Sequence, residues 1–475
     1  MQPSMFNVRV PLDGSGDVFL MNTFTDAQIV VSAEVADLLD RLAAPGPNTW
    51  TSDEREALST LAEHGFLVDS RETDYRNLRG FFHEIRESRD ELRMTVLTTL
   101  QCNFACDYCI QGDHGDYNRH AAKMSLDTAA AVADWAERRL DELGAETYVL
   151  TFFGGEPLIN LPVVYYLAER MWRFCESRGI RMLVNVITNG LLLTPDVVDR
   201  LAPCGLNGVK ITLDGDRETH DRMRPLRGGQ GTFDRIVHNI RQVAGRCRIA
   251  IGGNFDVDTA DSYPALLDFL REQEFAGSLS KVAFKPVIRE RGPATPAATA
   301  SKFIPLTAVT ADSKPLNGAC MTSAGTGVGA CDSCHVVDEQ MSWLREETTR
   351  RGFPTTDGVH MGPCEIHRRH AHTVGPDGSL YACPGFAGDA AQSTGHIDGR
   401  RDGPRRRAAR RFDRLAAWRS CGDCAFIPVC AGGCTVAAHS ELGDMDAPNC
   451  HKAALEAGVV SLAREAAARQ LELVG

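Results

Sequence analysis

Residues 102–109 read CNFACDYC and directly follow the apolar run 94–100. We expect the run to form a buried strand and the cysteines to lie on the loop after it. Three thiolates at this spacing, from Cys102, Cys106 and Cys109, can hold one iron–sulfur cube and leave its fourth iron open to a substrate or cofactor. A structural zinc site is the alternative, but zinc sites usually pair their cysteines in two CxxC-like halves.

Strands and helices alternate from residue 93 to about residue 290. Short apolar runs are separated by longer segments with a helical apolar period, such as 125–143, 161–178 and 233–244. Six such units predict an α/β fold, a partial (βα)6 TIM-like barrel with its active site at the C-terminal ends of the strands. The expected strands are 94–100, 148–153, 182–188, 208–213, 248–255 and 281–287.

A second motif follows the expected strand 148–153, and its residues are Gly154, Gly155, Glu156 and Pro157. Glycines let the backbone approach a ligand closely because they have no Cβ, and proline fixes the turn. Polar residues end the next two strands, where a side chain can reach a cofactor: Asn189 and Thr212. Arg224 or Arg235 can supply a cation for an anionic group of that cofactor. Asn189 has an alternative role, because it can instead cap a turn.

These motifs, in this order, resemble those of the radical S-adenosylmethionine (SAM) enzymes, including the aromatic Tyr108 before the last cysteine of the triad. The resemblance implies that the open iron holds SAM and that the Gly154–Pro157 segment binds its amino group. It also implies that Asn189, Thr212 and Arg235 lie at the cofactor. Reductive cleavage of SAM would then yield a 5′-deoxyadenosyl radical, which abstracts hydrogen from an unactivated C–H bond.

The C-terminal part carries a further set of cysteines: Cys364, Cys383, Cys421, Cys424, Cys430, Cys434 and Cys450. Their order and spacing resemble the signature of the SPASM domain, which one branch of radical SAM enzymes carries. The resemblance implies two auxiliary 4Fe–4S clusters. Cys421, Cys424, Cys430 and Cys450, the Cys421 group, would ligate one cluster fully, and Cys364, Cys383 and Cys434, the Cys364 group, would hold the other.

The fourth ligand of the Cys364 group stays open. Cys320, Cys331, Cys334 and His370 are candidates, and an open iron is another possibility. Residues 331–335, CDSCH, also spell a c-type haem attachment pattern. The N-terminal residues MQPSMF lack the charged and apolar regions of a signal peptide, so export and haem attachment are both disfavoured.

We expect five parts along the chain: a module at 1–90, the barrel at 91–290, a linker or insertion at 291–363, the cysteine-rich iron–sulfur domain at 364–452, and a helix at 453–475. Strand signals at 8–10, 18–21 and 28–31 precede two helices and a short strand, which predicts a small α+β, winged-helix-like module. It resembles the leader-peptide recognition domains of peptide-modifying enzymes. A packing module without a ligand is the alternative.

The chain has 475 residues, 16 cysteines and a net charge of −12. Clustered cysteines without an export signal indicate metal ligands in a reducing cytoplasm. The acidic balance argues against nucleic acid as a partner. No apolar stretch approaches the roughly 20 residues that span a bilayer, so no membrane partner is expected.

Enzymes with a SPASM domain mostly modify peptides and proteins, by cross-linking, epimerisation or oxidation. The resemblance therefore implies a peptide or protein substrate and an electron donor such as flavodoxin or ferredoxin. Sulfatase-maturase-like oxidation of Ser or Cys is an alternative, but Pro384 follows Cys383 where that branch has an Asp base. A small-molecule radical reaction is another. A non-catalytic iron–sulfur scaffold is disfavoured, because it would need no site for the SAM amine.

Overall fold

The computed structural model describes residues 1–14, 16–44, 49–109, 122–288, 332–356, 358–360 and 362–474. Cys320 and Cys331 lie outside these residues, as do the loops expected at 292–330. Cys334 belongs to α10 (Asp332–Arg350), but its side chain is not among those described. The ligand roles suggested for these cysteines therefore stay predictions.

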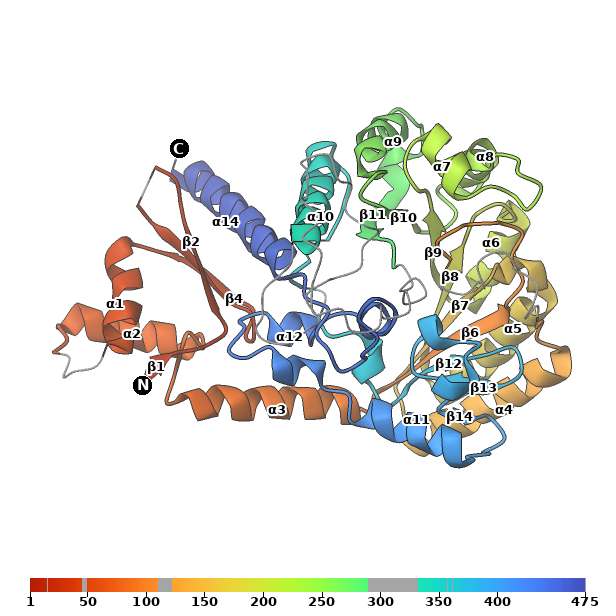
Figure 1. Ribbon diagram of the computed structural model, residues 1–475, viewed down its shortest axis with the longest axis horizontal. Helices are drawn as coiled ribbons and strands as arrows, with labels where there is room; N and C mark the ends of the chain where they lie inside the picture. The colour runs from red at the N-terminus through yellow and green to blue at the C-terminus, as the bar shows by residue number, and fades with distance from the viewer. Residues whose placement is uncertain are drawn as a thin grey trace, which may run out of the picture.

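A parallel sheet forms the centre of the chain (Figure 1). Its barrel strands lie side by side in chain order, each parallel to the next. They are β6 (Glu91–Thr99), β7 (Thr147–Gly154), β8 (Arg181–Thr188), β9 (Leu206–Thr212), β10 (Ile249–Phe255) and β11 (Leu279–Pro286). Each overlaps an expected strand, so the α/β fold with a partial barrel is confirmed.

Helices cover one face of this sheet (Figure 1). Alternate strand residues such as Val184, Val186 and Ile211 are buried against them. The residues between, such as Asn185 and Lys210, point to the opposite face, called the inner face below. The helices are α4 (Leu126–Leu143), α5 (Leu161–Arg178), α6 (Pro195–Leu201), α7 (Arg217–Met223), α8 (Phe233–Val243) and α9 (Tyr263–Arg271).

The ends of these helices follow local sequence signals. α4 begins after Ser125, whose side-chain oxygen accepts the backbone N–H of Thr128 at 3.0 Å. It ends at Gly144, which has φ 64° and so takes the left-handed conformation that favours glycine. Both ends agree with the helix expected from the apolar period.

The cysteine-rich part joins the same sheet, which the sequence did not predict. β12 (Ala371–Val374) pairs in parallel with β6, and β13 (Ser379–Tyr381) and β14 (Gly395–His396) follow in antiparallel pairing. Within the described residues the sheet therefore has nine strands. β12 covers the backbone groups of β6 that an edge strand would leave unpaired. The C-terminal domain is thus placed beside the strand that leads to the triad.

The N-terminal elements overlap those expected at 1–68, and two elements were not expected: the short strand β1 and one further helix. β2 (Asn7–Pro11), β3 (Val18–Asn22) and β4 (Ala27–Val31) form an antiparallel sheet, followed by α1 (Ala33–Ala43) and α2 (Ser52–Glu63). β1 (Gln2–Pro3) pairs with β5 (Leu67–Val68). The further helix is α3 (Arg71–Glu87), which starts at Ser70: the side-chain oxygen of Ser70 accepts the backbone N–H of Thr73 at 3.3 Å.

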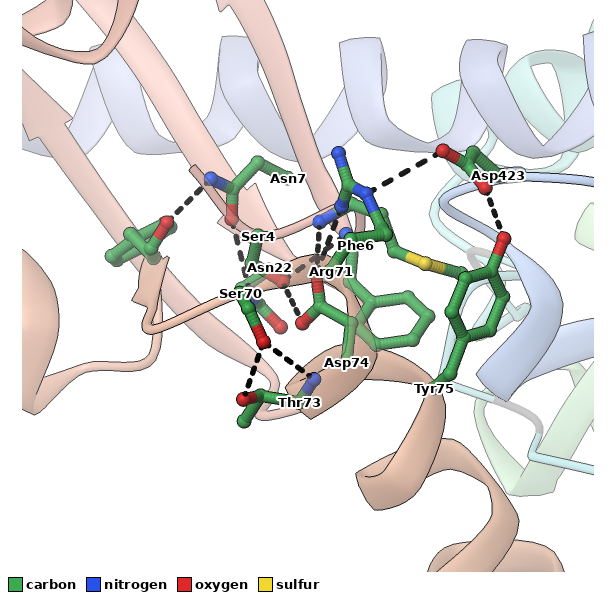
Figure 2. Close-up of polar contacts among 12 residues, drawn as sticks. Ser4, Phe6, Asn7, Asn22, Ser70, Arg71, Thr73, Asp74, Tyr75 and Asp423 are labelled. Carbon is green, nitrogen blue, oxygen red and sulfur yellow. Dashed lines mark hydrogen bonds and ion pairs between the residues drawn. The ribbon is translucent and has the colours of Figure 1, made fainter. Parts of the chain in front are cut away.

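α3 ties this module to the C-terminal domain. The Phe82 ring stacks on Trp418 with centroids 4.8 Å apart. Figure 2 shows that Arg71 and Tyr75 both contact Asp423, which lies between Cys421 and Cys424 in sequence. Arg71 Nε is 3.4 Å from the Asp423 carboxylate, and the Tyr75 hydroxyl donates a hydrogen bond to the same carboxylate. The module therefore packs through α3 against the segment around Trp418 and Asp423 in the cysteine-rich domain.

Candidate functional site

The loop of residues 102–109, called the Cys102 loop, follows β6 as predicted. Cys106 is buried, and Cys102 and Cys109 are half-buried. The pKa of Cys102 is raised to about 12, chiefly by burial and also by nearby Glu156, Cys106 and Cys109. Burial likewise raises the pKa of Cys106 to about 11. Three neighbouring thiols in this setting fit a metal cluster, because a metal charge keeps coordinating thiols ionised.

The thiols are neighbours, but they do not converge on one point. Among the residues that the structure describes, no three His, Cys, Asp or Glu side chains form a ready-made metal site. Charges act on one another over distances longer than a metal–sulfur bond of about 2.3 Å. The thiols can therefore raise one another's pKa without pointing at a single metal position. The chemistry of the donor set fits an iron–sulfur cluster, and the side chains would turn towards it on binding.

The glycines of the second motif hold the Cys102 loop in place. A Cβ on Gly154, which has φ +135°, would lie 2.3 Å from the carbonyl oxygen of Thr99, and one on Gly155 would lie 2.1 Å from that of Gln101. The Gly155 N–H donates to Thr99 O at 2.9 Å. These glycines are thus required by the backbone between β6 and the triad, whichever ligand approaches on the other side.

Glu156 is fully buried and joins the ends of β7 and β8. Its carboxylate accepts hydrogen bonds from the Thr188 hydroxyl and the Asn189 backbone N–H, each at 2.8 Å, and from the Leu158 N–H at 3.0 Å. Burial raises its pKa, and these hydrogen bonds oppose the shift. Pro157 begins the short helix η1 (Pro157–Asn160), which Glu156 caps. Glu156 therefore holds the Gly154–Pro157 segment in place, because both of its carboxylate oxygens already accept hydrogen bonds.

Asn189 reaches back to the Cys102 loop. Its side-chain nitrogen donates to Asn103 Oδ1 at 2.7 Å and lies 3.9 Å from Cys102 Sγ. Its side-chain oxygen also accepts the Leu191 N–H at 3.0 Å, so the turn-capping alternative is seen as well. The structure thus brings Asn189 together with the triad.

A buried polar network beside the triad was missed by the sequence analysis. Tyr108 donates its hydroxyl proton to Asp214, and Arg224 Nη1 lies 2.5 Å from the Tyr108 oxygen and 3.3 Å from Asp214. The backbone N–H of Asn254 donates to Asp214 at 2.6 Å. Asp214 is fully buried and Arg224 is 9% exposed. The charges of both act on the Cys106 thiol.

The other two predicted cofactor residues, Thr212 and Arg235, lie in different surroundings. Thr212 is half-buried on the inner face at the end of β9, opposite Gly252. Arg235 is exposed on α8, whose buried side includes Ile236. Arg224 is therefore the arginine beside the Cys102 loop. The roles predicted for Thr212 and Arg235 stay predictions.

The thiols of the Cys364 group act on one another electrostatically, and so do those of the Cys421 group. The pKa of Cys383 is raised to about 12, chiefly by burial and also by Cys364 and Cys434. Burial also raises the pKa of Cys421 to about 12, with further contributions from Cys430, Cys424 and Cys450. The members of each group are thus electrostatic neighbours. Their roles as ligands stay predictions.

His370 is turned towards the barrel helices. Its Nδ1 lies 3.2 Å from Arg139 Nη2 on α4, and the residue is 7% exposed. Burial, then Arg139, lowers its pKa. This contact engages one ring nitrogen away from the Cys364 group. The fourth ligand of that group stays open.

Residues 96–256 match the family model of the Radical SAM superfamily. An AdoMet-dependent heme synthase of Methanosarcina barkeri is 30% identical over 188 residues, which are 39% of this chain and 47% of that protein. A GTP 3′,8-cyclase of Clostridium perfringens is 32% identical over 153 residues, 32% of this chain and 42% of the relative. The chain thus spans about half the length of the curated relatives it matches.

Solved structures share the fold over more of the chain. Native anSMEcpe with bound AdoMet has a TM-score of 0.57 and 15% identity, over 78% of this chain and 98% of that one. The same protein with AdoMet and the Cp18Cys peptide has a TM-score of 0.56 and 16% identity, over 79% and 97%. Separately, none of the helices in the described ranges is long and apolar enough to cross a membrane.

Proposed function

We propose that this chain, which carries a radical SAM domain over residues 96–256, cleaves SAM reductively and uses the radical to modify a ribosomally made peptide or protein. The observation that carries the proposal is the Cys102 loop, whose three thiols are neighbours and whose backbone is held by Gly154 and Gly155. A 4Fe–4S cluster with an open iron, when bound there, supplies the electron that splits SAM into methionine and a 5′-deoxyadenosyl radical.

The chain's own residues position and shield this chemistry. Cys102, Cys106 and Cys109 hold the cluster, and the backbone of the Gly154–Pro157 segment receives the amino group of SAM. Glu156 keeps that segment in place, because its carboxylate already accepts three hydrogen bonds. Asn189 and Thr212 contact the cofactor from the ends of β8 and β9. The electron comes from a donor such as flavodoxin or ferredoxin.

Three observations support a peptide or protein substrate. The auxiliary cysteines lie in two groups, as in a SPASM domain with two 4Fe–4S clusters. Residues 1–90 contain a three-stranded antiparallel sheet followed by helices, and an edge of that sheet suits an extended peptide. The structurally similar anSMEcpe has been solved with a peptide bound. A cross-link, an epimerisation or an oxidation would each fit.

A small-molecule radical reaction is the second candidate. Two sequence relatives, a heme synthase and a GTP cyclase, favour this reaction. Sulfatase-maturase-like oxidation is less favoured, because Pro384 occupies the place of the expected base. A precursor peptide encoded beside the gene, tested as substrate, separates these candidates.

We expect anaerobically reconstituted protein to bind about twelve irons, in three 4Fe–4S clusters, and to release 5′-deoxyadenosine from SAM once reduced. Iron and sulfide analysis with chromatography of the nucleoside measures both. A single cluster, stoichiometric zinc, or no nucleoside after full reconstitution would each contradict the proposal.

We expect the N-terminal module to bind its peptide along β4. Within the described residues β4 pairs with β3 alone, so its other edge can accept an added strand. Hydrogen exchange read by mass spectrometry should show residues 27–31 slowed about tenfold or more by the precursor peptide, which corresponds to about 1.4 kcal/mol. α1 serves as the internal control, because it does not border that edge. Full modification without any protection of β4 would show that the module does not recognise a leader.

Deleting residues 1–88 is a weaker test of recognition, because the deletion removes α3. The stacking of Phe82 on Trp418 and the contacts of Arg71 and Tyr75 with Asp423 would be lost with it. We therefore expect the truncated chain to lose irons from the Cys421 group as well as peptide binding.

A further inference from the structure

A strongly basic helix lies in the cysteine-rich domain and takes no part in the candidate site. It is α11 (Gly403–Asp413), at the edge of the molecule beside β14 (Figure 1). Residues 400–414, called the basic segment, hold eight arginines and two aspartates, whereas the whole chain has a net charge of −12. The arginines are Arg400, Arg401, Arg405, Arg406, Arg407, Arg410, Arg411 and Arg414.

Most arginines of the basic segment have no acidic partner. Arg405 pairs with Asp402 at 2.8 Å, and Arg400 pairs with Asp398 at 2.5 Å. The other six arginines are all exposed, and within the described ranges none of them forms an ion pair. Their positive charges therefore face solvent without a neighbouring carboxylate to neutralise them.

These arginines do not stabilise the helix that carries them. Arg405 and Arg406 lie in the first turn of α11, where the positive end of the helix dipole repels cations. Arg410 stands four residues after Arg406 and three after Arg407, and like charges at these spacings destabilise a helix. Local conflicts of this kind are expected where a surface serves a function.

The buried side of α11 packs beside the Cys364 group. Phe412 is 6% exposed, and its ring centroid lies 5.4 Å from that of Phe386, three residues after Cys383. Cys383 packs against the same apolar cluster. α11 also contacts η5 (Glu365–His367), which directly follows Cys364. The exposed arginines are thus carried by a helix that rests on two of the segments holding this group.

The chemistry of the basic segment narrows the class of its partner. The apolar side chains of α11, Ala408 and Phe412, are buried in the protein, so the helix has no apolar face to insert into a membrane. Phe412 is also its single aromatic residue, which leaves none to stack on the bases of a nucleic acid. An acidic protein needs neither feature, because exposed arginines attract its carboxylates and steer its approach.

We propose that the exposed arginines of α11 form the docking surface for an acidic electron-carrier protein, such as a flavodoxin or ferredoxin. The identification of the partner as an electron carrier rests on the function proposed above, whereas the docking surface rests on charge, exposure and packing. In the docked complex the carrier loses one electron and the cluster of the Cys364 group gains it, with no transfer of a proton or another atom. Interfaces of such carriers are small, which suits a partner that must leave after each electron.

The test measures the affinity of an acidic flavodoxin for the reconstituted full-length chain, by titration calorimetry at about 50 mM salt. The variant Arg406→Gln/Arg407→Gln/Arg410→Gln keeps good helix formers and removes like-charge repulsion, so α11 should stay folded. We expect its affinity for flavodoxin to fall at least about tenfold, because three attractive charges are lost. At about 500 mM salt the difference should disappear, because salt screens exposed charges.

The variant Arg178→Gln/Arg200→Gln/Arg246→Gln is the matched control. It makes the same change in net charge at three exposed arginines on the outside of the barrel. It should change the affinity for flavodoxin less than about threefold. Hydrogen exchange of the unmodified chain gives a readout without any variant: flavodoxin should slow exchange in residues 403–413.

SAM cleavage separates the docking surface from the proposed function. With dithionite, a small reductant that needs no docking surface, the α11 variant should release 5′-deoxyadenosine as fast as the unmodified chain. With reduced flavodoxin, it should release the nucleoside at least about fivefold more slowly. No release from the unmodified chain with dithionite would count against the proposed function, whereas the binding measurement does not require cleavage.

Three results would overturn the docking surface. They are no binding of flavodoxin or ferredoxin at low salt, equal affinity of the α11 variant and the unmodified chain, and protection from exchange elsewhere than at α11. Loss of precursor-peptide or RNA binding in the α11 variant, with flavodoxin binding unchanged, would assign the helix to that other partner and likewise overturn the proposal.

Discussion

The variant Cys102→Ala/Cys106→Ala/Cys109→Ala is expected to release no 5′-deoxyadenosine from SAM and to keep its auxiliary clusters. The Cys102 loop provides three thiols and no fourth, whereas the Cys421 group provides four. Loss of the triad removes the cluster with the open iron, so iron should fall from about twelve to about eight per chain. Iron analysis and nucleoside chromatography on the same anaerobic preparation measure the two outcomes together.

Cys175→Ala is the matched control. Cys175 is 1% exposed on α5 and packs in the apolar core of the barrel. It should keep all of its iron and its SAM cleavage. Cleavage that survives in the triple variant would show that the radical chemistry starts elsewhere.

Asp214→Asn is expected to destabilise the barrel by about 3–5 kcal/mol, because it leaves the Arg224 cation buried without its carboxylate. The Asp214 side chain is 0% exposed and that of Arg224 is 10% exposed. Arg224→Met leaves Asp214 with the N–H donors of Asn254 and should cost less. Urea unfolding of the two single variants and the double variant gives the coupling free energy between these residues.

Arg217→Met controls for the loss of an arginine, since Arg217 pairs with Asp234 on the surface with both side chains more than half exposed. It should change the unfolding free energy by about 1 kcal/mol or less.

The two network variants should also shift the reduction potential of the Cys102-loop cluster in opposite directions. Arg224→Met removes a cation beside Cys106 and lowers the potential, and Asp214→Asn removes an anion and raises it. Equal shifts of the same sign would show that only packing has changed.

The sequence by itself determined the barrel strands, the loops that follow them and the place of the cysteine triad on one of these loops. These features are local. Apolar runs form buried strands, Ser125 and Gly144 begin and end a helix through their own backbone neighbours, and Cys102, Cys106 and Cys109 share one loop. The residues that hold that loop were found for the same reason, since Gly154 and Glu156 directly follow a strand.

Only the tertiary structure decided which distant residues meet. Tyr108 follows β6, Asp214 follows β9, Arg224 follows α7 and Asn254 lies in β10, so their hydrogen bonds form only when these elements have come together. The pairing of β12 with β6 likewise depends on an edge that exists only after the barrel strands have assembled. Local patterns encode the conformation of a segment, but pairing and burial depend on the whole chain, because they arise from contacts that no single segment contains.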